Sequence, residues 1–165
     1  MGERQKVGAV TQTGRNLSGA WVALETVAIV LMLGLLAFAP LGAQQLERVK
    51  KRMEVGPLRA GEALFRQGDP GDRLYVLTQG SISIVGGNGP VRQRFESFSP
   101  GVMMGDMSML DGVGRSADAI ADNEVVVWSL TRATYEALVL DDPLLGERLT
   151  RNIAIHLSER LRGPG

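Results

Sequence analysis

The sequence predicts an α+β fold: an antiparallel β-roll, similar to a double-stranded jelly roll, with a helix before it and two helices after it. Three observations predict this class. Short apolar runs separated by glycine-rich turns fill the middle of the 165-residue chain, as expected of an all-β roll or barrel. A helical spacing of apolar residues precedes this region, and a second helical pattern follows it. The length suits one ordinary domain.

The composition excludes several classes of function. Eighteen basic residues balance eighteen acidic ones, so the chain has no net charge that would attract nucleic acid. The absence of cysteine excludes a disulfide framework, a thiolate metal site and a cysteine nucleophile. A single histidine, His156, makes histidine-based triads and multi-histidine metal sites implausible. What remains is a binding module, or an enzyme that works with carboxylates alone.

Two regions precede the predicted domain, which spans residues 42–165. Residues 1–19 are polar and lack periodicity, and we expect a flexible lead. Residues 20–41 are mostly apolar, with Glu25 as their one charged residue, and their length matches the roughly 20 residues needed to cross a bilayer. They predict either a membrane-spanning helix or a helix buried against the domain or a partner. A basic cluster follows this segment and would place the domain on the cytoplasmic side; it consists of Arg48, Lys50, Lys51 and Arg52.

The elements of the domain follow in order. Leu46, Val49 and Met53 have helical spacing and predict a first helix over residues 44–54. From residue 55 to 87 the pattern changes to short strands and hairpin turns. Further strands are predicted over residues 91–98, 117–121 and 124–130.

Two helices are predicted after the strands. Thr131 is a candidate N-cap for a helix over residues 132–140, and Asp142 with Pro143 predicts the start of a second helix. This second helix extends to Arg162 and carries an apolar residue at every fourth position. The stripe predicts packing onto the domain or a seam between two copies of the chain; it consists of Leu145, Leu149, Ile153, Leu157 and Leu161.

The segment GDMSMLDGVGRSA, residues 105–117, concentrates glycines and charged side chains. Its first residues can form a helical turn whose backbone N–H groups are unpaired and converge on an anion. Arg115 adds a planar guanidinium suited to phosphate oxygens, and Ser116 adds a hydroxyl. Asp106 would repel phosphate, so it would accept a hydrogen bond from a neighbouring hydroxyl such as a ribose 2′-OH. A phosphate beside a sugar hydroxyl indicates a nucleotide.

Simpler interpretations of the same side chains stay open at this point. Arg115 could form an ion pair with Asp111 or Asp118, and Asp106 could be a helix N-cap. We expect Asp118 to be an exposed strand residue. The methionines around this segment are expected to pack, because methionine fills irregular space.

The chain resembles the cyclic nucleotide-binding domain family, shared by catabolite activator proteins, protein kinase A regulatory subunits and nucleotide-gated channels. The resemblance extends from around Phe38 to Arg162. It rests on RAGEALFRQGDPGDRLYVLTQG at residues 59–80, on SPGVMMGD at residues 99–106, and on GDMSML and GRSA within residues 105–117. The order of elements agrees, with residues 131–140 as the family's hinge helix and residues 143–162 as its lid helix.

The resemblance implies a set of ligand-binding residues. Arg115 would hold the equatorial phosphate oxygens, Ser116 would add a phosphate contact, and Asp106 would hold the ribose 2′-OH. The backbone N–H groups of Met107, Ser108 and Ala117 would donate to the phosphate. Val102 and Met103 would line the wall near the sugar and base. The full set is Val102, Met103, Gly105, Asp106, Met107, Ser108, Arg115, Ser116 and Ala117. Asn152 or His156 of the lid helix would face the purine.

Three positions depart from the family pattern. Asp106 stands where the family has Glu, one methylene longer, and Gly114 stands where it has Pro. The aromatic residue expected near Met103 and Met104 is missing.

The resemblance implies a regulatory module, not an enzyme, that binds cAMP or cGMP in its phosphate cassette and signals by movement of the lid helix. The hydrophobic segment 20–41 suits attachment to a bacterial channel or transporter, or to a membrane, with the domain on the cytoplasmic side. The alternative is a degenerate fold that acts in protein interaction or structure without nucleotide. No cofactor is expected. No direct nucleic-acid partner is expected either, because the sequence ends shortly after the lid helix, and a homodimer is an open alternative.

Overall fold

The structure is a computed structural model that describes residues 41–87 and 92–163. The predicted lead, residues 1–19, and nearly all of the hydrophobic segment 20–41 lie outside this range, so the membrane-helix prediction stays a prediction. No helix within the described ranges combines the length and the apolar character that crossing a bilayer requires.

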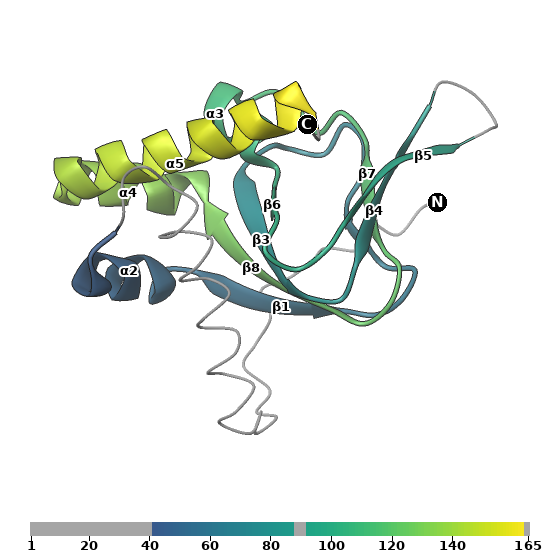
Figure 1. Cartoon of the computed structure of the whole chain (residues 1–165), viewed down its shortest axis with the longest axis horizontal. Helices are drawn as coiled ribbons and strands as arrows, with labels where there is room; N and C mark the ends of the chain where they lie inside the picture. The colour runs from purple at the N-terminus through teal and green to yellow at the C-terminus, as the bar shows by residue number, and fades with distance from the viewer. Residues whose placement is uncertain (1–40, 88–91, 164–165) are drawn as a thin grey trace, which may run out of the picture.

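Two antiparallel four-stranded sheets form the β-roll, which confirms the predicted fold class (Figure 1). The first sheet has the order β1-β8-β3-β6 and the second the order β2-β7-β4-β5. The strands of the first sheet are β1 (Glu54–Leu58), β8 (Val125–Thr131), β3 (Arg73–Gln79) and β6 (Met103–Met104). Those of the second are β2 (Ala63–Phe65), β7 (Asp118–Ala121), β4 (Ile82–Gly86) and β5 (Gln93–Phe98). Sequence-distant strands are therefore neighbours, as the pairing of Tyr75 with Ser129 shows.

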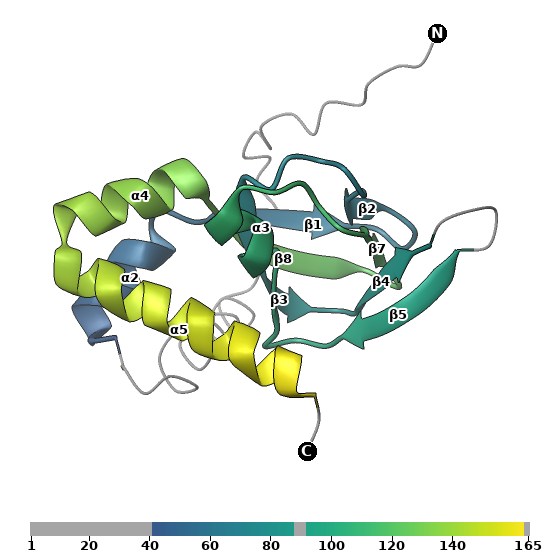
Figure 2. The same ribbon diagram turned by 90° about the horizontal axis from the view of Figure 1, so that it is seen from above.

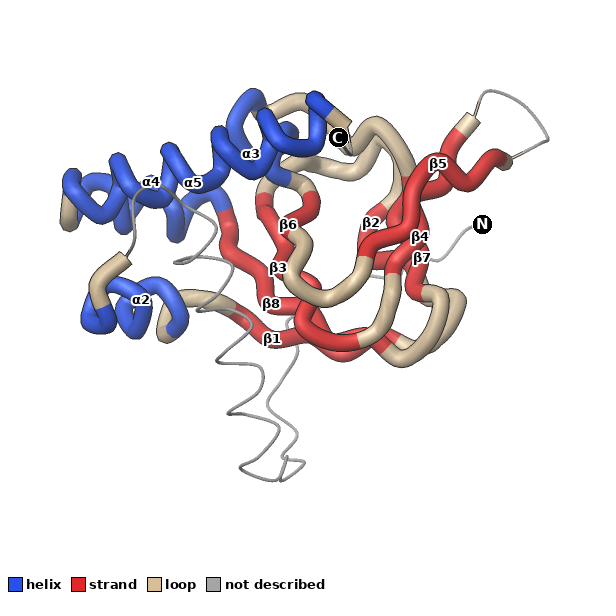
Figure 3. Tube along the Cα trace, in the orientation of Figure 1, coloured by secondary structure: helices blue, strands red, loops and turns tan. Residues whose placement is uncertain are grey.

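Within the described residues four helices accompany the sheets, and Figure 2 shows that the one before β1 and the two after β8 gather at one end of the roll. These three are α2 (Ala43–Lys50), α4 (Arg132–Asp141) and α5 (Pro143–Arg162), while α3 (Asp106–Asp111) lies between β6 and β7 in the chain. The tube in Figure 3 shows α5 crossing from this end toward α3 and the strands.

Local capping explains why the last two helices begin where the sequence predicts. The Thr131 hydroxyl accepts from the Thr134 N–H at 3.1 Å, and the Asp142 carboxylate accepts from the Leu145 N–H at 3.0 Å. Asp142 also pairs with Arg48 of α2 at 2.7 Å. The cap of α5 thus ties the first described helix to the last one.

The apolar stripe of α5 is buried at its first three positions, which are Leu145, Leu149 and Ile153. Leu157 is half-buried and Leu161 is 76% exposed. The stripe therefore packs within the chain over most of its length. Whether a second copy contacts its exposed end is not tested, and the homodimer stays a prediction.

Two expectations from the sequence need correction. The first helix ends at Lys50 rather than at Glu54, because Glu54 already belongs to β1 and pairs with Ser129 of β8. Asp118 is not an exposed strand residue: only 2% of it is accessible.

Candidate functional site

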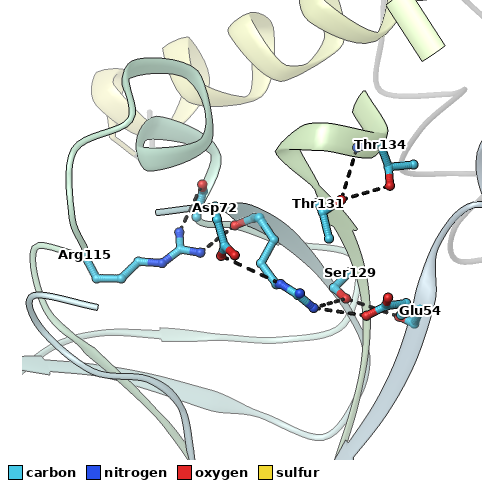
Figure 4. Close-up of polar contacts among 8 residues, drawn as sticks. Glu54, Asp72, Arg115, Ser129, Thr131 and Thr134 are labelled. Atoms are coloured by element: carbon cyan, nitrogen blue, oxygen red, sulfur yellow. Dashed lines mark hydrogen bonds and ion pairs between the residues drawn. The ribbon is translucent and has the colours of Figure 1, made fainter. Parts of the chain in front are cut away.

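Arg115 lies at the centre of the predicted cassette, between the end of α3 and the start of β7. It is buried, with 4% of its surface exposed. Its Nη1 donates to the Gly105 carbonyl at 3.2 Å and its Nη2 to the Arg73 carbonyl at 2.5 Å. Figure 4 shows the Arg115 side chain extended toward β3. These two carbonyls bring the β3 strand, the start of α3 and the arginine together.

Two aromatic rings support the guanidinium of Arg115. Its central carbon lies 4.5 Å from the centroid of the Phe65 ring and 5.6 Å from that of Tyr75. Cation–π contacts of this kind fix a cation without neutralising it. Burial raises the pKa of Tyr75, although the charge of Arg115 opposes this, so the phenol stays neutral. Neither ring therefore supplies a counter-charge.

Arg115 has no carboxylate within 4 Å among the described residues. The ion pairs with Asp111 or Asp118 that the sequence left open are absent there. Burial lowers the pKa of Arg115, while the more distant charges of Asp72 and Asp69 raise it. The Nε atom of Arg115 is also buried and has no hydrogen-bond partner. A buried cation with an unused donor and no paired anion is poised to hold an anion.

Asp118 is instead neutralised by other residues. Its carboxylate accepts from the Gln67 N–H at 2.7 Å and pairs with Arg92 at 2.7 Å and Arg66 at 3.4 Å. Burial alone would raise the pKa of Asp118, but the Gln67 N–H and the two arginines outweigh it and lower the pKa. Through these contacts Asp118, the first residue of β7, holds β7 against the loop that follows β2.

Asp106 is the first residue of α3 and is also buried, with 1% of its surface exposed. The N-cap of this helix is Gly105, at φ +77°, so Asp106 is not the cap. Its Oδ1 accepts from the Met107 N–H at 3.1 Å and pairs with Arg160 at 2.9 Å, and its Oδ2 lies 3.4 Å from Nδ1 of His156. Burial would raise the pKa of Asp106, but these three neighbours lower it below its ordinary value.

The remaining predicted residues take different positions. Gly105 lies beside the Arg115 guanidinium and would not accept a Cβ, which would collide with Nη1. Met103 is buried under α5, Val102 packs half-buried against the core between the sheets, and Ala117 is buried. Met107 and Ser116 are exposed, and Ser108 is half-buried. The Met107 N–H, expected to face phosphate, donates to Asp106.

Of the two lid residues expected to face the purine, His156 contacts the cassette, because its Nδ1 lies 3.4 Å from Oδ2 of Asp106. The Met103 N–H donates to its Nε2 at 3.4 Å. Asn152 is buried farther along α5, where it lines a small cavity with Val49 and Leu74. No described contact tests the purine role of either residue.

Sequence reasoning missed three residues of the site: Phe65, Tyr75 and Arg160. The two rings lie 50 and 40 positions before Arg115 in the sequence, and no local pattern joins them to it. Arg160 could have been noticed, because it follows His156 by one helical turn and so lies on the same face of α5.

The comparisons with known proteins agree with this geometry. The sequence profile described as "cyclic nucleotide-binding domain" matches residues 56–142. A cyclic nucleotide-gated potassium channel of Mesorhizobium japonicum is 27% identical over 157 residues, covering 87% of this chain and 42% of the channel. A cyclic AMP receptor protein of Thermus thermophilus is 34% identical over 103 residues, covering 62% of this chain and 46% of that protein. The chain therefore spans less than half the length of either relative.

Solved structures share the fold. A cyclic nucleotide-binding domain from Methylobacillus flagellatus superposes with a TM-score of 0.79 at 24% identity, covering 88% of this chain and 82% of that one. The catabolite activator protein of Thermus thermophilus superposes with a TM-score of 0.64 at 29% identity, covering 74% of this chain and 56% of that one. Since the matching profile covers more than half of the sequence and the β-roll encloses the cassette arginine, the chain belongs to the cyclic nucleotide-binding domain family.

Proposed function

We propose that the chain is a regulatory module that binds a cyclic nucleotide, cAMP or cGMP, and passes the binding event to a neighbouring unit through α5. Arg115 holds the cyclic phosphate and Asp106 accepts a hydrogen bond from the ribose 2′-hydroxyl. The observation that carries the proposal is Arg115 itself. It is buried, held in place by two carbonyls, and unpaired with any carboxylate within 4 Å in the described part of the chain.

The charge of Arg115 decides the class of ligand. An isolated buried cation is costly, so proteins pair such a group with an anion. A cyclic phosphate carries one negative charge and oxygens that a guanidinium can bind in two-point geometry. The neighbouring carboxylate of Asp106 cannot serve the same phosphate, and its acceptor oxygens suit a hydroxyl. Arg115 and Asp106 together thus fit a ligand in which a phosphate is joined to a sugar.

Relatives support cAMP as the first ligand to test. The Thermus thermophilus protein is named a cyclic AMP receptor, and a Toxoplasma gondii protein kinase A regulatory domain was crystallised with cAMP. That domain is 25% identical to this chain, with a TM-score of 0.61.

The channel relative supports attachment to a membrane channel or transporter on its cytoplasmic side. Its alignment covers 87% of this chain and must therefore reach into the hydrophobic segment 20–41. We propose that this segment links the domain to a membrane or to a membrane protein.

A second candidate is a degenerate domain that acts in protein interaction without nucleotide. The observation that favours it is the pairing of Asp106, whose carboxylate already has Arg160 and His156 as partners. Binding measurements separate the two candidates.

The test is calorimetric titration of the full chain, kept in a mild non-ionic detergent, with cAMP and with cGMP. Arg115→Ala should weaken binding at least about tenfold, because a hydrogen bond to a charged group contributes about 1.5–3 kcal/mol. Arg94→Ala is the matched control, since Arg94 is exposed and pairs with Asp122 at 2.9 Å. It should leave the affinity unchanged.

The unfolding midpoint without ligand shows whether each variant is folded. Saturating nucleotide that produces neither heat nor a higher unfolding midpoint in the unchanged chain would contradict the proposal and favour the degenerate domain.

A further inference from the structure

Arg132, the first residue of α4, reaches back to the end of the cassette helix α3. Its Nη2 donates to the Ser108 carbonyl at 2.6 Å, although the two residues are 24 positions apart in the sequence. Figure 2 shows α3 beside the end of α4 that follows β8. The contact therefore joins the helix of the predicted phosphate cassette to the helix that the sequence identifies as the hinge.

The end of α3 has no cation of its own. This helix has only six residues, ends in Asp111, and carries no basic residue in its last turn. The carbonyl groups at the end of a helix carry partial negative charge, which a nearby cation stabilises. Helices as short as α3 are marginal without tertiary contacts. Because Arg132 supplies the missing cation from another element, the placement of α3 depends on where α4 lies.

Close packing and a second hydrogen bond fix the start of α4 at this place. The C-cap Gly112 has φ +77°, and a Cβ added there would lie 2.8 Å from Nη1 of Arg132. The backbone N–H of Arg132 donates to the Asp72 carbonyl at 2.7 Å, in the turn whose Gly71 lies against Ser108. A displacement of α3 therefore cannot leave the start of α4 behind without breaking these contacts.

We infer that Arg132 is a positioning residue that orients α3 for the nucleotide and passes a displacement of α3 to α4. This inference rests on the proposed function. The carbonyl groups at this end of α3 disfavour an anion, so Arg132 acts through the helix and does not hold the phosphate. Movement of α4 reaches α5 as well, because the hydroxyls of Tyr135 in α4 and Thr150 in α5 are hydrogen-bonded.

The first test is calorimetric titration of the full chain, in mild non-ionic detergent, with cAMP. Arg132→Met keeps the apolar stem and removes the donor, and it should bind about three- to thirtyfold more weakly, the range in which residues that link two sites modulate their coupling. Arg132→Lys should recover most of this loss, because its ammonium can donate to the Ser108 carbonyl. Arg151→Met is the control, since Arg151 is exposed on α5 and pairs with Glu147, and it should bind like the unchanged chain.

Hydrogen exchange separates positioning from a merely structural role. Saturating cAMP should slow amide exchange in both α3 and α4 of the unchanged chain. In Arg132→Met it should still slow exchange in α3, whereas the amides of residues 133–141 should no longer respond. An arginine that only stabilised the fold would lower the unfolding midpoint when replaced, but it would leave the response of α4 intact.

The outcomes distinguish this inference from the proposed function. If the unchanged chain binds cAMP and α4 of Arg132→Met responds as in the unchanged chain, the positioning role is wrong and the binding function stands. Arg132→Lys that binds no better than Arg132→Met would also overturn the positioning role. If the unchanged chain binds neither cAMP nor cGMP at saturation, the proposed function is wrong and the positioning role fails with it.

A second variant covers the case in which Arg132→Met does not fold. Arg132→Gln then takes its place in both measurements, because glutamine is polar and uncharged and its amide ends before the position of Nη2. Weaker binding and an unresponsive α4 in this variant support the positioning role, and full affinity with a full response overturns it.

Discussion

Arg115 and Asp118 are buried charged residues three positions apart, and their surroundings differ in whether they balance the charge. Asp118 has two arginines and a backbone N–H as partners. Among the described residues, Arg115 contacts carbonyls and aromatic rings and has no carboxylate within 4 Å. A group whose charge is fully matched within the chain contributes to stability, whereas a group left unmatched is available for a ligand. The contrast assigns the structural role to Asp118 and the binding role to Arg115.

The role of Asp118 predicts a particular dependence of stability on pH. Its folded pKa is lowered, so its carboxylate stabilises the fold above the ordinary aspartate pKa of about 3.9 and this contribution is lost as the pH falls below that value through the folded pKa. Asp118→Asn should lower the unfolding midpoint at pH 6. It should also lessen the fall of that midpoint between about pH 5 and pH 2. Thermal unfolding followed by circular dichroism across this range measures both effects.

The control for this measurement is Asp141→Asn, because Asp141 is exposed and its nearest arginine, Arg52, is 3.7 Å away. It should leave the acid dependence nearly unchanged. An Asp118→Asn protein whose midpoint falls with acid as steeply as that of the unchanged chain would show that other carboxylates account for the slope.

At the scale of elements, α3 is held close to the turn between β2 and β3. A Cβ added to Gly71 in this turn would collide with the Ser108 Cβ and would lie 2.5 Å from the Val113 carbonyl oxygen. Gly71 is therefore required by close approach, since its φ is not in the left-handed region. The turn fixes the distance between the cassette helix and the roll.

Gly71→Ala should destabilise the protein by about 1–3 kcal/mol, the usual cost of overpacking. It should also weaken nucleotide binding, because displaced α3 moves Asp106. Urea unfolding and the cAMP titration measure the two effects. Gly56→Ala is the control, since a Cβ there would lie 3.9 Å from a Val127 methyl group, an ordinary contact.

The elements that could be predicted from the sequence are those with local causes. The start of α5 at Pro143 follows from Asp142 accepting from the Leu145 N–H, three residues away. The start of α4 follows likewise from Thr131. Glycine-bearing turns similarly located the strands, and the order of elements identified the family.

The features that could not be predicted depend on contacts between distant residues. The burial of Asp118 requires Arg66 and Arg92, which are 52 and 26 positions away. The pairing of Asp106 with Arg160 joins residues 54 positions apart. Helical periodicity likewise placed Leu161 in the apolar stripe of α5, but this residue is 76% exposed, whereas Leu145, Leu149 and Ile153 are buried. Periodicity defines a face of a helix, and only the tertiary fold defines what that face meets.

At the scale of the whole molecule, the first sheet, β1-β8-β3-β6, separates two apolar cores. One core lies between this sheet and the helices, and includes Leu74, Val76 and Met103 together with buried residues of α2, α4 and α5. The other lies between the two sheets and includes Leu77 and Met104. Neighbouring residues of one strand point to opposite faces, so β3 and β6 contribute to both cores. The helices and the second sheet are thus coupled through one shared sheet.

Because Met103 belongs to one core and Met104 to the other, substitutions at these two positions can perturb each core separately. They are adjacent in β6 and only 2% and 1% exposed. Each substitution by alanine should destabilise the chain by about 2–5 kcal/mol, because it deletes a buried side chain and leaves a cavity. Hydrogen exchange should differ between them: Met103→Ala should speed exchange in α4 and α5, and Met104→Ala should speed it in β4 and β7.

The same pair tests whether the helices can be loosened without opening the roll. If α5 is the mobile unit that responds to ligand, Met103→Ala should change its exchange while Arg115 stays fixed by the carbonyls of Gly105 and Arg73. Identical exchange patterns in the two variants would instead mean that the helices and both sheets open as one cooperative unit. Signalling through α5 would then require movement of the whole β-roll, because a helix that opens only together with the sheets cannot respond to the cassette by itself.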